Sequence, residues 1–174
     1  MSDLSYPIGK FVAQSVISEA QRQELINSLE QLPVRMRAAI AGLSHEQLET
    51  PYRPEGWTVR QTVHHTADSH ANAYVRFKLG LTEEVPTIKP YDEKRWAELE
   101  DGRNAAPELS LRLLEALHER WTICLRALSP AVFAREVRHP EAGVMSLDVM
   151  LQMYDWHGRH HVAHITRLRE RMGW

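Results

Sequence analysis

Apolar side chains recur every three or four positions over four stretches of the chain, the spacing that one buried face of an α-helix produces. The first stretch begins with a capping box at Ser18 and Gln21 and continues to about Leu43, with a kink or restart expected at Pro33. The other three cover residues 58–81, 107–125 and 146–172. Strand signals are few. The pattern therefore predicts an all-α fold, a four-helix bundle formed by residues 1–174 as a single domain.

The connections between these helices differ in length. Residues 1–17 contain Pro7 and Gly9 and are expected to form an extended arm, and Ser44 should cap a short turn of helix. The connection between the second and third helices, residues 86–107, should be irregular apart from a short helix near 93–99, and we expect it to shield one end of the bundle. Residues 130–140 show little periodicity.

Composition and charge exclude several classes of protein. The 174 residues carry 21 Lys and Arg against 23 Asp and Glu, a net charge of -2, so nucleic-acid binding is disfavoured. We expect no membrane association, because no apolar run approaches the ~20 residues of a membrane span, and we expect no secretory signal because no apolar run follows the first residues. The one cysteine, Cys124, fits a reducing compartment, which predicts a cytoplasmic protein. Its neighbours indicate a small packed side chain rather than a catalytic thiol.

Histidine is the unusual residue, with ten in the chain and four between positions 157 and 164. Two pairs on the last helix have the i,i+4 spacing that places side chains on one face: His157 with His161, and His160 with His164. The apolar stripe of this helix contains the first pair and also His164, whereas His160 falls toward its edge; the stripe is defined by Met150, Tyr154, Ile165 and Leu168. A metal ion would relieve the cost of burying these imidazoles. By itself the pair is equally compatible with hydrogen-bonded core histidines or a solvated face.

The second helix offers candidates for a third ligand. His65 lies on its polar side, opposite an apolar side made by Val63, Ala67, Tyr74 and Phe77. That polar side could be solvated, or it could line a wet cleft facing the last helix. His64 and His70 lie nearer the apolar side and suggest packing or surface residues. Periodicity alone does not choose between these arrangements.

Several stretches resemble the DinB/YfiT-like metalloproteins, specifically the YfiT-like branch, and the resemblance runs from Leu4 to Trp174. They are LSYPIG, TPYRPEGWTVRQTVHHTADSH, RFKLGLTEE, PYDEKRWAEL, LHERWT and DWHGRHHVAHITRLRERMGW. The resemblance implies a four-helix bundle that binds one divalent ion through three histidines. One ligand follows the helix-opening Trp57 by eight residues, which is His65, and the others form H-x-x-x-H, which is His157 and His161. Many relatives have Gln at the position of His164, whose role is therefore open.

The same resemblance implies the chemistry and the assembly. Relatives are described as metal-dependent hydrolases and as transferases of low-molecular-weight thiols such as bacillithiol, and they are thought to be homodimers. Three imidazoles leave positions open on the ion, the catalytic pattern of zinc; Zn²⁺ is expected, with Ni²⁺ or Co²⁺ also accepted. We favour thiol S-transfer with a small-molecule substrate, partly because no carboxylate is an obvious base. Metal-dependent hydrolysis and a non-enzymatic metal-stabilised binding module are the alternatives.

Further residues are candidates for supporting roles. Asp68 could act as a base or orient a ligand, although a solvated carboxylate is the simpler interpretation. Tyr52, Arg53 and Trp57 precede the second helix and could shape the rim of a pocket. The apolar side of that helix is a candidate dimer surface, unless it faces the core of the bundle.

Overall fold

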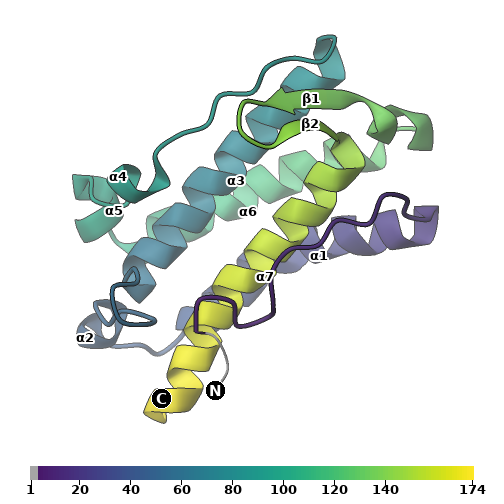
Figure 1. Ribbon diagram of the computed structural model, residues 1–174. Helices are drawn as coiled ribbons and strands as arrows, with labels where there is room; N and C mark the ends of the chain where they lie inside the picture. Colours follow the sequence, from purple (N-terminus) through teal and green to yellow (C-terminus); the bar gives the residue numbers. More distant parts are fainter. Residues whose placement is uncertain (1–3) are drawn as a thin grey trace.

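The computed structural model describes residues 4–174, so the first three residues of the predicted arm lie outside it. Four long helices dominate the fold and confirm the predicted bundle (Figure 1). They are α1 (Glu19–Ile40), α3 (Val59–Thr82), α6 (Pro107–Arg126) and α7 (Leu147–Met172). Helix α1 packs against α6 and α7, and α3 packs against the same two helices. The first two long helices of the chain, α1 and α3, therefore lie diagonally across the bundle.

The predicted helix starts are confirmed by their caps. Ser18, Ser44 and Thr58 each accept a hydrogen bond from the backbone three residues on, completing capping boxes for α1, for α2 (His45–Leu48) and for α3. Ser146 also caps α7, because its side chain accepts a hydrogen bond from Val149 N. The restart expected at Pro33 is wrong, because α1 continues through it as one element. Pro33 still lacks an N–H, so the helix loses one hydrogen bond there.

The long connection after α3 differs from the prediction in its course. It contains two short helices, α4 (Glu93–Trp96) and α5 (Glu100–Asn104), of which only the first is predicted. It runs along α3 toward the helix start instead of covering one end of the bundle (Figure 1). Gln61 holds it there by donating to the carbonyl of Ala97 at 2.9 Å. The segment consequently covers the polar side of α3.

A small hairpin replaces the irregular connection expected before α7. After the 3-10 helix η1 (Pro130–Ala134), strands β1 (Glu136–His139) and β2 (Gly143–Ser146) pair antiparallel, with Val137 opposite Met145. Strands this short carry too little alternation to be recognised from sequence. The hairpin also holds the start of the connection after α3, because Ile88 N of that connection donates to the carbonyl of Arg138 at 2.9 Å.

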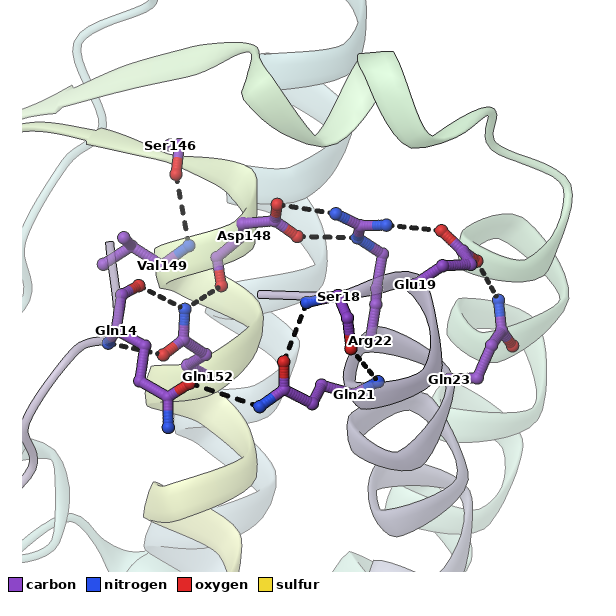
Figure 2. Close-up of polar contacts among 10 residues, drawn as sticks. All are labelled: Gln14, Ser18, Glu19, Gln21, Arg22, Gln23, Ser146, Asp148, Val149 and Gln152. Carbon is purple, nitrogen blue, oxygen red and sulfur yellow. Dashed lines mark hydrogen bonds and ion pairs between the residues drawn. The ribbon is translucent and has the colours of Figure 1, made fainter. Parts of the chain in front are cut away.

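The N-terminal arm crosses the outer side of α7, as Figure 1 shows. Gln152 of α7 exchanges two hydrogen bonds with the backbone of Gln14, at 2.8 and 3.0 Å, and Trp156 Nε1 donates to Gly9 O at 3.2 Å. Figure 2 shows the adjacent ion pair, in which Arg22 of α1 contacts both carboxylate oxygens of Asp148, at 2.7 and 2.8 Å. These contacts fasten α7 to α1 and to the arm.

The core has two apolar clusters separated by a layer of histidines. One cluster includes Leu29 and Trp121, and the other includes Met36 and Leu114. Along each of the helices α3, α6 and α7, the residues between the clusters include buried histidines: His70, His118, His160 and His161. Within residues 4–174, no helix is long and apolar enough to cross a membrane.

The apolar side of α3 faces this core. Val63, Ala67 and Phe77 are fully or almost fully buried within one chain, and Tyr74 packs at the cluster edge. They are therefore not an exposed dimer surface. The homodimer stays a prediction without support from this face.

Candidate metal centre

Three histidines from α3 and α7 converge on one point. His65 Nε2 lies 3.3 Å from His157 Nε2, and His161 Nε2 lies 3.2 Å from the same atom. The three form a group whose potential ligand atoms all lie within 4.8 Å of one another. The structure thus brings together the three residues that the sequence predicts, from two helices that are far apart in the sequence.

Burial keeps these imidazoles neutral. It lowers the pKa of His65 to about 4, and it lowers the pKa values of His157 and His161 well below the usual range. Neighbouring histidines lower all three further. A neutral imidazole carries one nitrogen lone pair, the form that a metal ion requires. The donor set fits a borderline divalent cation such as Zn²⁺.

A pocket of about 330 Å³ opens on the triad. Beside the three histidines, its wall is formed by Trp57, Ser69, Tyr91 and Glu93. The Trp57 ring lies 4.3 Å from the ring of His65, so the helix-opening tryptophan lines the pocket as predicted. A pocket is therefore present on the polar side of α3, facing α7 as predicted, with the connection segment as a further wall.

Tyr91 and Glu93 are pocket residues that the sequence does not predict. Both belong to the long connection, and nothing in their spacing shows that this segment folds back along α3. Glu93 is exposed at the start of α4, and its carboxylate is the acidic group among the pocket-lining residues. Burial raises the pKa of Tyr91 to about 12, so its phenol stays protonated at neutral pH.

The other predicted rim residues lie outside this pocket. Tyr52 stacks on His164, with ring centroids 3.9 Å apart, and the Arg53 guanidinium carbon lies 5.5 Å from the centroid of the Tyr52 ring. Asp68 is half-buried instead of fully solvated. Burial first, and then the charge of Asp101, raises its pKa to about 6.

The remaining histidines of α7 do not join the triad. His160 stacks on Trp156 with ring centroids 4.5 Å apart, and it is buried despite its predicted place at the edge of the stripe. His164 Nε2 lies 3.4 Å from the carbonyl of Ser5 in the arm. His164 is thus one helical turn beyond the ligands and held by other groups.

Two buried histidines, His70 and His118, form a chain of contacts that starts at the Nδ1 atom of His157. His70 Nε2 lies 3.2 Å from His157 Nδ1, and His118 Nε2 lies 3.1 Å from His70 Nδ1. His118 was missed, although it occupies an apolar-stripe position of α6 between Leu114 and Trp121. The presence of a histidine at a core position of α6 is the signal by which His118 could have been recognised from the sequence.

Comparison with known proteins places these features in a family. The model of the DinB superfamily matches residues 28–165. The chain is 51% identical over 173 residues to "Putative metal-dependent hydrolase YfiT" of Bacillus subtilis strain 168, covering 99% of this chain and 97% of that protein. An analogously named protein of Bacillus mycoides strain KBAB4 is 50% identical over 174 residues, covering all of both chains.

The fold is similar to that of a solved relative. The structure of YfiT from Bacillus subtilis, described as having an unusual four-helix bundle topology, superposes with a TM-score of 0.96. The match covers 98% of each chain at 51% identity.

Proposed function

The chain belongs to the DinB superfamily, and on this premise we propose that His65, His157 and His161 bind one divalent ion in the active site of an enzyme. The observation that carries the proposal is the convergence of three neutral Nε2 atoms beside an open pocket. Zn²⁺ is the ion we expect, and the same donors accept Ni²⁺ or Co²⁺. Residues 1–174 act as one unit, since both ligand-bearing helices are needed.

A divalent ion in such a shell acts as a Lewis acid that makes a water or a thiol more acidic near neutral pH. The residues around it have separate tasks in our proposal. Glu93 accepts the proton that the nucleophile gives up, as a carboxylate lining the same pocket. Tyr91 donates a hydrogen bond from its protonated phenol to the substrate, and Trp57 forms an apolar wall.

Hydrolysis of a small ester or amide is the reaction that this arrangement supports best. The sequence-based preference for thiol transfer rested partly on the lack of a carboxylate that could serve as base. Glu93 weakens that reason, because this acidic residue is among those that line the pocket. The names of the relatives point in the same direction.

Transfer of a low-molecular-weight thiol is the second candidate. The donor set supports this candidate. Because the three imidazoles are neutral, they would not offset the positive charge of a bound ion, which would then favour the thiolate form of a substrate. Trp57 and Tyr91 would pack against the acceptor. A metal-stabilised binding module without catalysis is the third candidate, and an open pocket beside the triad argues against it.

Parallel assays of the zinc-loaded protein separate the three candidates. Metal-dependent cleavage of simple ester or amide substrates supports hydrolysis. A metal-dependent rate with monochlorobimane and bacillithiol, cysteine or glutathione supports transfer instead. If the metal raises the melting temperature and neither assay shows a rate, the binding module is the correct interpretation.

Two further properties are part of the proposal. We propose a cytoplasmic location, which suits a chain with one cysteine, and a homodimer. Light scattering that gives the 20.1 kDa mass of one chain at micromolar concentration would contradict the dimer.

A further inference from the structure

A row of three imidazoles links the candidate metal centre to the backbone of α1. It begins at His157 Nδ1, passes through His70 and His118, and ends where His118 Nδ1 lies 2.6 Å from the carbonyl oxygen of Leu29. The intervening nitrogen–nitrogen distances are 3.2 and 3.1 Å. His70 and His118 are 0% and 1% exposed, so water does not compete for these contacts.

The carbonyl at the end of the row is available because of Pro33. In an α-helix the carbonyl of residue 29 accepts from the N–H of residue 33. Proline has no N–H, and α1 continues through Pro33. The Leu29 carbonyl is thereby left without its helical donor in a buried place, where an unpaired polar group costs about 1–3 kcal/mol. His118 supplies the missing donor.

This contact fixes the direction of every hydrogen bond in the row. A carbonyl oxygen only accepts, so His118 carries its proton on Nδ1 and presents a bare Nε2 to His70. His70 must then donate from Nδ1, which leaves its own Nε2 bare toward His157. His157 in turn donates from Nδ1, and its Nε2 lone pair points at His65 and His161. Burial supports the neutral forms, since it lowers the pKa of His118 to about 4.

We infer that Pro33, His118 and His70 are positioning residues that hold His157 in the Nδ1–H tautomer, with its Nε2 lone pair aimed into the triad. The use of that lone pair for a metal rests on the function proposed above, whereas the tautomer itself does not. Ligating histidines commonly donate to a carboxylate or a carbonyl directly. Here two further imidazoles extend the same support across the bundle.

The row is an anchor and not a path for protons. Its far end is a carbonyl inside the apolar cluster that contains Leu29, which offers no exchangeable proton. The support is also specific to one ligand. His161 Nδ1 is buried and has no hydrogen-bond partner among residues 4–174. The ring of His157 is therefore more firmly fixed than that of His161.

Nitrogen-15 NMR of the wild-type, metal-free protein tests the tautomers directly. We expect His70, His118 and His157 to carry Nδ1 protons, with slow exchange for the two that are fully buried. An Nε2 proton on His70 or His118 would overturn the inference. In Pro33→Ala the new N–H competes for the Leu29 carbonyl, so the His118 Nδ1 proton should move upfield. An unchanged chemical shift would show that Pro33 does not influence the hydrogen bond between His118 and the Leu29 carbonyl.

Zinc affinity tests the consequence, measured by competition with a chromophoric chelator. His70→Leu should weaken binding about 10–100-fold, the usual effect of losing a ligand's hydrogen-bond partner. His70→Gln keeps one donor and one acceptor and should lose less. His64→Gln is the matched control, since His64 is also buried on α3 but bonds Ser110 and the Ala105 carbonyl.

The outcomes separate this inference from the proposed function. Affinity of His70→Leu within about twofold of wild type would overturn the positioning role. A wild-type protein that binds no zinc would overturn the proposed function, while the tautomers measured without metal would still decide the proton order.

Discussion

Gly158 of α7 lies directly against Leu32 of α1, so closely that a Cβ at position 158 would meet Leu32 Cδ2 at 2.6 Å. Gly158 is the residue after His157, and its contact with Leu32 limits how closely α7 can approach α1. A glycine inside a helix costs about 1 kcal/mol relative to alanine. The close approach of the two helices is what compensates for that cost.

Gly158→Ala should destabilise the protein despite the better helix propensity of alanine, because the methyl group overpacks Leu32. We expect a net loss of about 1–2 kcal/mol in the free energy of unfolding, measured by urea denaturation. Combining it with Leu32→Ala should cost less than the sum of the two single changes, since the clash disappears. Additive losses would show that the contact does not limit the packing.

Asp148→Ala should affect stability and spare the metal centre. It removes the carboxylate that pairs with Arg22 (Figure 2). The Arg22 side chain is only 7% exposed. Leaving that guanidinium with Glu19 alone should cost about 2–4 kcal/mol, because the buried charge loses its main partner. Zinc content should remain that of wild type. Loss of zinc from a folded variant would show that the Arg22–Asp148 ion pair also supports the metal centre.

The metal-free protein should lose stability in acid. Burial lowers the pKa values of His65, His118 and His160 to about 4 and that of His164 to about 3, against about 6.5 in an unfolded chain. As the pH falls below about 6.5 the unfolded chain binds protons first, so the free energy of unfolding declines toward pH 4. Asp68, with its pKa raised to about 6, acts in the opposite direction between about 6 and 4. It is one group against these four histidines and against His157 and His161, whose pKa values burial also lowers.

Urea midpoints of chelator-treated protein measure this decline. A constant midpoint from pH 7 to about pH 4.5 would contradict it. Zinc-loaded protein should show a steeper decline, because protons then also displace the ion from the imidazoles.

Most of the fold follows from the sequence because its signals are local. Capping residues such as Ser18 and Thr58 act within one turn, and apolar periodicity spans a single helix. The course of the connection after α3 depends on long-range contacts such as Gln61 with Ala97, which periodicity does not contain. For that reason His65 could be predicted from the sequence, whereas Tyr91 and Glu93 could not.

The same limit applies to the interior of the site. His118 stands in the apolar stripe of α6, and its partner depends on a carbonyl that Pro33 leaves without a helical donor. Each of these features is visible in the sequence. The contact between His118 and the Leu29 carbonyl is apparent only once α1, α3 and α6 are packed together.

Glu93→Gln should lower kcat about 10²–10⁴-fold on whichever ester or amide the zinc-loaded protein cleaves, because the variant cannot accept a proton. Zinc affinity should change little, since Glu93 is not one of the grouped ligands. Asp68→Asn is the matched control, because this half-buried carboxylate of α3 is not among the pocket-lining residues. Equal losses in both variants would remove Glu93 from its role as base.

The zinc content of single histidine variants tests the central claim most directly. After zinc loading and dialysis, elemental analysis should find one ion per chain in the wild type and in His160→Ala and His164→Ala, whose rings lie outside the triad. His65→Ala, His157→Ala and His161→Ala should each lose most of it while remaining folded by circular dichroism. Full zinc in the His157→Ala and His161→Ala proteins, with loss in His160→Ala or His164→Ala instead, would contradict the account.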